Sequence, residues 1–163
     1  MHSTSEIIDN LFIGEFFSSY PVQIRDLGIE LIIDVTCDVC YFNYPNVDYI
    51  QIPIEDDEYT NIVKYFNYTY NLIDNKLKKG KKVLVYCQAG VSRSPTIVIA
   101  YLMKKLNINL TEAYELVLSK RSIVKPNSGF YFQLKLYNIF LSTKHFVEQK
   151  IYQCQLFTCF ITD

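Results

Sequence analysis

The chain is 163 residues long, half of its residues are hydrophobic, 15% are aromatic, and its formal net charge is −1. This length and apolar content predict one globular domain with a proper core and exclude a disordered chain. The nearly neutral charge excludes strong attraction to nucleic acid or to an anionic membrane, so neither is expected as a partner.

The first third of the chain predicts short strands and one short helix. In chain order the expected elements are a strand over 6–8, a strand over 11–14, a helix over 20–27, and strands over 31–36 and 49–53. Pro21 fits the first turn of the helix, and Pro53 ends the last strand because proline has no N–H for the ladder. Residues 55–58 are all acidic and predict an exposed loop.

The rest of the chain predicts helices around one more strand. The expected elements are an amphipathic helix over 59–78, a strand over 83–86, a buried helix over 96–103, a helix over 110–120 and a last core helix that starts in 126–130. Gly80 suits the end of the first of these helices. Asn109 and Glu112 form a capping box for the helix over 110–120.

These elements predict a single domain over 1–141, followed by a C-terminal extension over 142–163. The extension is too apolar for a free tail. We expect it to pack on the core or to form the interface of a homodimer, and we favour core packing.

No apolar run is long enough for a membrane span, and the N-terminus lacks a signal-peptide pattern. Five cysteines without scaffold spacing favour a reducing compartment, so we expect a cytoplasmic protein and leave access to the nucleus open.

The stretch 83–95 joins a buried strand, a tight loop and the start of a helix, an arrangement whose N–H groups and dipole favour an anion. Cys87 begins this loop and Arg93 ends it. Oriented donors would stabilise the thiolate of Cys87, and the planar guanidinium of Arg93 fits phosphoryl oxygens better than a lysine would. Gly90 permits backbone angles that a side chain forbids, and Ser94 can donate a hydrogen bond to the Cys87 sulfur.

The sequence from Cys87 to Ser94 resembles the Cys-x5-Arg signature of protein tyrosine phosphatases, in the form used by dual-specificity phosphatases. The segment Ala100–Met103 resembles the continuation of that signature, and the similarity spans about residues 5–140. The resemblance implies an α/β fold with a central mixed, mostly parallel five-stranded sheet flanked by about six helices. It also implies a cysteine-dependent protein phosphatase that forms a cysteinyl-phosphate and uses neither a metal nor another cofactor.

The resemblance gives each residue of the loop a role. Cys87 is the expected nucleophile, and Arg93 and Ser94 are further catalytic residues. The residues expected to bind the phosphoryl group are Gln88, Ala89, Gly90, Val91, Ser92 and Arg93. Arg121 either meets a second phosphate or an acidic part of the substrate, or balances the dipole at a helix end, and both interpretations stay open. Asn127 is expected to brace the loop.

Breaking a phosphate ester requires a proton for the leaving oxygen. The chain has only two histidines, His2 and His145, and both lie outside the predicted core. We therefore expect the proton donor to be a carboxylic acid on a neighbouring loop. Asp56 is the favoured residue, since 52–56 resembles the acid-loop segment of the phosphatases. The neighbouring carboxylates are rivals, because an acidic run is often only a solvated loop: Glu55, Asp57 and Glu58.

Tyr86 departs from the family pattern, in which a histidine precedes the nucleophile. A phenol can donate a hydrogen bond but carries no positive charge, so activity is expected to be slower or shifted to higher pH. A phosphate-binding pseudophosphatase of low activity is therefore an alternative.

Asp34, which is polar within an apolar strand, is expected to accept buried N–H groups and not to react.

The loop also bears on the substrate. Gln88, Ala89 and Val91 are uncharged, whereas related phosphoinositide and RNA-triphosphate phosphatases place extra cations there, so a phosphoprotein substrate is favoured. The resemblance implies action on both phosphotyrosine and phosphoserine or phosphothreonine.

A thiol–disulfide enzyme built on Cys37 and Cys40 is a third interpretation, although that pair does not begin a helix.

Overall fold

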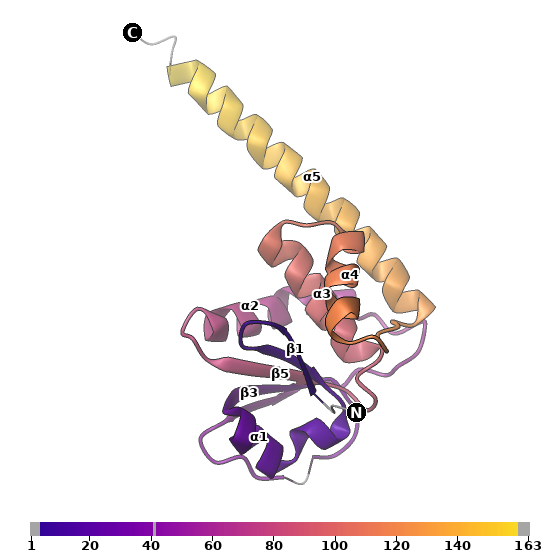
Figure 1. Ribbon diagram of the computed structural model, residues 1–163. Helices are drawn as coiled ribbons and strands as arrows, with labels where there is room; N and C mark the ends of the chain where they lie inside the picture. The colour runs from indigo at the N-terminus through magenta and orange to yellow at the C-terminus, as the bar shows by residue number, and fades with distance from the viewer. Residues whose placement is uncertain (1–3, 41, 160–163) are drawn as a thin grey trace.

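A mixed sheet of five strands runs through the middle of the protein (Figure 1). The computed structural model describes residues 4–40 and 42–159, with side chains up to residue 146. In spatial order the strands are β1 (Thr4–Ile8), β2 (Leu11–Gly14), β5 (Lys82–Tyr86), β3 (Ile29–Asp34) and β4 (Asp48–Gln51). Only β1 pairs antiparallel to its neighbour, so the sheet is mixed and mostly parallel, which confirms the predicted fold class.

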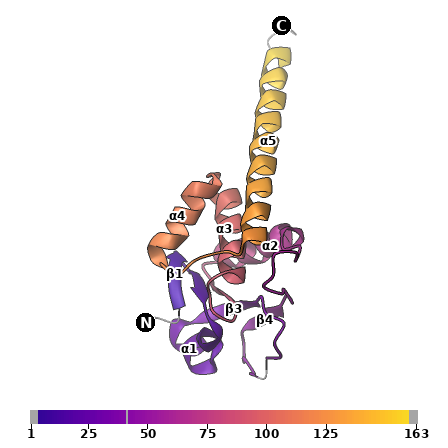
Figure 2. The ribbon, with the colours of Figure 1, turned by 90° about the vertical axis from the view of Figure 1, so that its right-hand side faces the viewer.

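Helices cover both faces of the sheet (Figures 1 and 2). One face carries α1 (Pro21–Leu27) and the short 3-10 helix η1 (Phe16–Ser19). The other face carries α2 (Phe66–Leu77), α3 (Arg93–Leu106), α4 (Leu110–Lys120) and the first part of α5 (Ser128–Cys159). The described residues form five α-helices and two 3-10 helices, compared with the expected number of about six helices.

Two hydrophobic cores fill the space between these layers. Alternate residues of a strand point to opposite faces, so Ile33 and Val85 pack toward α2 and α3, while Ile32 and Leu84 pack toward α1. All four side chains are fully buried, which is why β3 and β5 read as continuous apolar runs. The strand predictions over 31–36 and 83–86 depended on this pattern. The strand over 83–86 is confirmed with one more residue at its start, and the other is confirmed as a strand that lies two residues earlier, over 29–34.

The predicted helix over 59–78 is wrong at its start. A 3-10 turn, η2 (Val63–Tyr65), comes first, and α2 begins only at Phe66. The reason is that Gln133 Oε1, from α5, accepts the N–H groups of Ile62 and Val63 at 2.9 and 3.0 Å. By contrast, α4 has the predicted bounds, because its capping box between Asn109 and Glu112 is local.

The last helix, α5, is much longer than the others. Phe130 and Leu134 on its first turns are buried in the core, while Phe132 and Leu136 on the opposite side are exposed. Beyond the body of the protein the helix continues outward to Cys159 in both views (Figures 1 and 2). Most of the side chains of the extension over 142–163 lie outside the described residues, so its packing and its role in a homodimer stay predictions. In the part of the chain that is described, no helix combines the length and apolarity needed to cross a bilayer.

The start of α5 makes a close approach that predicts an effect on stability. A Cβ at Gly129 would overlap the main-chain carbonyl of Glu58, so Gly129→Ala should lower the free energy of unfolding by about 3 kcal/mol. Gly28→Ala is the matched control, because a Cβ there meets nothing within 4 Å and only the left-handed φ of 69° is strained, at about 1 kcal/mol. Urea unfolding of both variants measures the difference, and equal losses would contradict the close packing at Gly129.

Candidate active site

The loop between β5 and α3 lies where the carboxyl ends of three parallel strands meet, an edge that commonly holds ligands in α/β proteins. Cys87 follows β5 directly, and Arg93 is the first residue of α3. Gly90 has a left-handed φ of 63°, and a Cβ on it would lie 2.7 Å from the Gly14 carbonyl oxygen. Glycine is therefore required at this position for both conformational and steric reasons.

The carbonyl groups of the loop are turned outward into the protein. The Gln88 carbonyl accepts the Phe16 N–H at 3.2 Å, and the Val91 carbonyl accepts the Lys125 N–H at 2.8 Å. Within the described residues, no hydrogen bond pairs the main-chain N–H groups of 88–92. With its carbonyls held from outside and its N–H groups unpaired, the loop can surround an anion.

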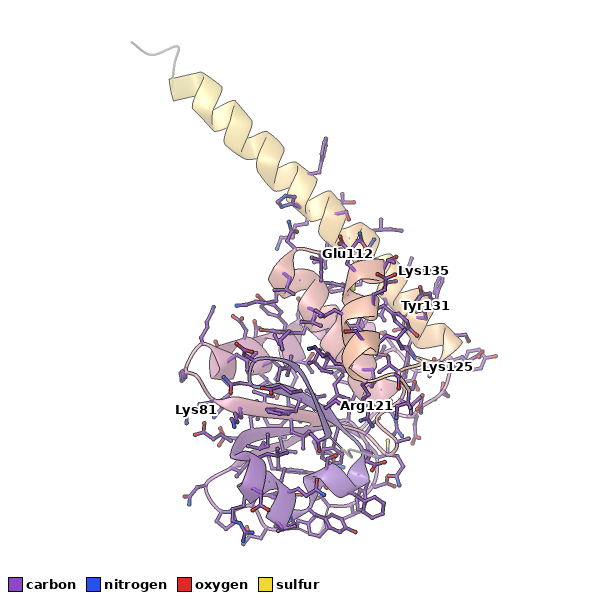
Figure 3. All side chains as sticks on the ribbon, in the orientation of Figure 1. Lys81, Glu112, Arg121, Lys125, Tyr131 and Lys135 are labelled. Atoms are coloured by element: carbon purple, nitrogen blue, oxygen red, sulfur yellow. The ribbon has the colours of Figure 1, made fainter. Side chains whose placement is uncertain are left out.

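Arg121 holds the same loop from outside. Its guanidinium is buried, Nε donates to the Gly90 carbonyl at 2.8 Å, and Nη2 donates to the Ala89 carbonyl at 3.4 Å. Figure 3 shows it at the end of α4, toward the sheet. Burial lowers the pKa of Arg121, while the charges of Glu15 and Cys87 oppose that shift. This is a bracing position that neither of the two interpretations of Arg121 described.

Cys87 is almost completely buried, with 1% of its surface exposed. The Ser94 hydroxyl donates to its Sγ at 3.2 Å, which confirms the predicted hydrogen bond. The Cys87 N–H donates to the Gly14 carbonyl at 3.4 Å, so the end of β2 fixes the start of the loop. A thiolate at this position would have a hydroxyl donor and the N-terminus of α3 as neighbours.

Arg93 has a donor without an acceptor. Its Nη1 donates to the Ile54 carbonyl at 3.1 Å, which holds the side chain in place. Its buried Nε lies 3.5 Å from Asp56 Oδ2, an ion-pair distance, yet makes no hydrogen bond. Because a buried N–H without a partner is costly, an oxygen of a bound ligand would complete the site.

Asp56 is the carboxylate of the acidic run that contacts the loop between β5 and α3, residues 87–93, which is called the phosphate loop below for its expected ligand. Its Oδ1 accepts from the Ser92 hydroxyl at 2.7 Å and from the Asn127 amide at 2.9 Å. The Asn127 N–H in turn donates to Ser92 Oγ at 3.1 Å. Asn127 therefore connects the start of α5, the acidic loop and the phosphate loop, which confirms that it is a brace.

The rival carboxylates point elsewhere. Asp57 accepts the N–H groups of Tyr59 and Thr60, both at 2.8 Å, and the Thr60 hydroxyl is the largest cause that lowers the Asp57 pKa. A lowered pKa keeps a carboxyl ionised at the pH where a general acid must be protonated. Glu58 accepts from the Ser128 hydroxyl.

Cys37 lies beside Glu55. Partial desolvation of this exposed thiol, together with the hydrogen bond to Glu55, raises the pKa of Cys37. Cys40 contacts the Tyr44 hydroxyl at 3.6 Å, and both thiols are free. In the described ranges no cluster of three His, Cys, Asp or Glu side chains could hold a metal ion.

The main-chain acceptors of Gly14 and Ile54 were not predicted from the sequence. Both are carbonyl groups, which carry no residue-specific signal. The role of Gln133 was also missed, although it lies in a segment with family resemblance; its Nε2 donates to the Thr60 carbonyl at 2.9 Å and so fixes the far end of the acidic loop.

The chain matches the family model "Dual specificity phosphatase, catalytic domain" over residues 11–140. It is 39% identical to Protein phosphatase Slingshot homolog 2 of Homo sapiens over 147 residues, which is 88% of this chain and 10% of that protein. It is 37% identical to human Dual specificity protein phosphatase 14 over 131 residues, 80% of this chain and 66% of that protein. The chain thus spans only a tenth of the first relative and about two thirds of the second.

Solved structures show the same likeness. A mouse putative dual specificity phosphatase, complexed with zinc tungstate, aligns with a TM-score of 0.82 and 28% identity, covering 88% of this chain and 91% of its own. Human DUSP28 aligns with a TM-score of 0.81 and 26% identity, covering 87% of this chain and 97% of its own.

The unpartnered Nε of Arg93 predicts a geometric requirement for the guanidinium. Arg93→Lys should weaken the binding of inorganic phosphate nearly as much as Arg93→Ala, by about 30-fold or more, because lysine keeps the charge and loses the two-pronged geometry. Isothermal titration calorimetry of both variants measures the effect. If Arg93→Lys bound phosphate within threefold of the unsubstituted protein (a difference of about 0.6 kcal/mol), charge alone would suffice.

Proposed function

Because the chain belongs to the dual specificity phosphatase family, we propose that it hydrolyses phosphotyrosine and phosphoserine or phosphothreonine esters of proteins through a cysteinyl-phosphate. The observation that carries this proposal is the phosphate loop itself. Its carbonyls are bonded outward, its N–H groups and Arg93 Nε are unpaired, and Cys87 stands at its start. Such a loop supplies donors to the three non-bridging oxygens of a phosphoryl group.

In the first step, the Cys87 thiolate attacks the phosphorus atom while the bond from phosphorus to the ester oxygen breaks. The electron pair of that bond goes to the leaving oxygen, and protonated Asp56 donates its proton there. Asp56 is assigned this role because of its position, since Ser92 and Asn127 hold its carboxyl against the loop between β5 and α3 and beside Arg93. Arg93 and the loop N–H groups stabilise the charge on the equatorial oxygens.

In the second step, a water molecule attacks the cysteinyl-phosphate. Asp56, now a carboxylate, takes a proton from that water, and the sulfur leaves as a thiolate with the bonding electron pair. The Ser94 hydroxyl, 3.2 Å from Sγ, donates to the thiolate that forms. The products are inorganic phosphate and the enzyme with its starting proton restored to Asp56.

Phosphoproteins are the proposed substrates because the loop offers no further cations at Gln88, Ala89 and Val91. The main alternative function for the same site is that of a pseudophosphatase, which would bind phosphate and leave the ester intact. Tyr86, in place of the family's histidine, is the feature that favours it. The measurements below distinguish a phosphatase from a pseudophosphatase. Both would bind phosphate, but only a phosphatase has an ester hydrolysis rate that the substitutions can lower.

Cys87→Ser should lower turnover by at least about 1,000-fold while phosphate affinity is largely kept, since a hydroxyl does not ionise near neutral pH and the loop donors remain. Hydrolysis of a nitrophenyl phosphate and phosphate titration measure the two effects. Cys37→Ser is the control, and it should retain full activity. Turnover of Cys87→Ser within tenfold of the unsubstituted enzyme would contradict the covalent mechanism.

Asp56→Asn should slow phosphoserine and phosphotyrosine peptides by about 100-fold or more and nitrophenyl phosphate much less. A nitrophenolate leaves with little help, whereas a serine alkoxide needs a proton. The falling limb of the pH–rate profile, which reports protonated Asp56, should flatten.

Asp57→Asn is the matched control for Asp56→Asn, because the Asp57 carboxylate is occupied by Tyr59 and Thr60. It should leave the falling limb of the profile in place. If Asp57→Asn removed that limb and Asp56→Asn did not, the acid would be the neighbouring residue.

A further inference from the structure

Below the phosphate loop lies a buried cluster of polar side chains that the mechanism above does not use. Asp34 and Tyr86 are directly opposite each other at the ends of β3 and β5, and each is only 1% exposed. The Tyr86 hydroxyl donates to Asp34 Oδ2 at 2.7 Å. The Tyr49 hydroxyl donates to the same oxygen at 2.5 Å, and the Thr36 N–H donates to Oδ1 at 2.8 Å.

The cluster is built to keep its donors neutral. Burial, reinforced by the hydrogen bond to Asp34, raises the pKa of Tyr86 and of Tyr49. Both phenols therefore stay protonated across the physiological range and continue to donate. A buried carboxylate with three donors costs far less than an unpaired one, so the cluster is stable only with its members in place.

The cluster fixes the residue that precedes the nucleophile. The Tyr86 carbonyl accepts the Val35 N–H at 3.0 Å, and the side chain is held by Asp34 at the same time. Residue 86 is thus held through both its main chain and its side chain. The next residue is Cys87, whose Sγ must meet the Ser94 hydroxyl.

We infer that Asp34 and Tyr86 act as a coupled pair of positioning residues, which sets the place of the Cys87 sulfur through the hydrogen bond from the Tyr86 hydroxyl to the Asp34 carboxyl. The inference rests on the proposed function. Tyr86 here meets a carboxylate across the sheet, and this contact gives the phenol a task that does not require positive charge. The substitution of the family's histidine is then matched by Asp34 and is compatible with turnover.

Kinetics of three variants test the pair. Tyr86→Phe and Asp34→Asn should each lower kcat about tenfold with KM changed less than twofold, because the substrate contacts remain while the sulfur is misplaced. The double variant should lose no more than about twofold beyond the larger single loss, whereas independent effects would multiply to about 100-fold. Tyr86→His, whose imidazole can also donate to Asp34, should turn over faster than Tyr86→Phe.

Tyr49→Phe is the matched control, because it removes a hydrogen bond to the same Asp34 oxygen and keeps the hydrogen bond from the Tyr86 hydroxyl to Asp34. It should lower the melting temperature as Tyr86→Phe does and leave kcat within twofold. A tenfold loss of kcat in Tyr49→Phe, or multiplying losses in the double variant, would overturn the inference and leave a purely structural cluster.

Alkylation of Cys87 by iodoacetamide tests the same pair without substrate. Tyr86→Phe and Asp34→Asn should slow it relative to Tyr49→Phe, because the thiolate loses alignment with its donors. Equal rates in all variants would contradict the positioning role. An unsubstituted enzyme that turned over no phosphate ester would contradict the proposed function, and the alkylation rates would still decide the inference.

Discussion

The parallel alignment of β2, β5 and β3 is the constraint on which the rest of the structure depends. Because these strands run the same way, their last residues lie side by side at one edge of the sheet. Gly14 supplies a carbonyl to the Cys87 N–H, and Asp34 supplies a carboxylate to the Tyr86 hydroxyl. The loop that follows can then place its carbonyls outward and leave its N–H groups for an oxyanion.

The other part of the candidate site is the acidic loop, residues 55–58, which the start of α5 holds in place. The acidic loop carries Asp56, and the start of α5 holds it through Asn127, Gly129 and Gln133. Asn127 also contacts Ser92, so the loop proposed to bind phosphate and the loop that carries the proposed acid share one brace. Packing alone therefore holds the proposed acid, Asp56, against the loop that begins with Cys87.

Features encoded locally could be predicted from the sequence, and features encoded by distant contacts could not. The phosphate loop and the helix over 110–120 are specified by residues within a few positions of each other, and both were predicted. The start of α2 depends on Gln133, about 70 residues away, so the local spacing of apolar residues was misleading there. The tasks of Arg121 and of the Asp34–Tyr86 pair depend on strand register and tertiary packing, which composition and spacing do not reveal.

The most direct test of the account is to trap the covalent intermediate. The enzyme would be mixed with a phosphotyrosine peptide, quenched in acid within milliseconds, digested and analysed by mass spectrometry. The account predicts a phosphoryl group on the peptide that contains Cys87, attached to sulfur. Turnover without any phosphoryl group on Cys87, or with the group on Ser94 or another residue, would contradict it.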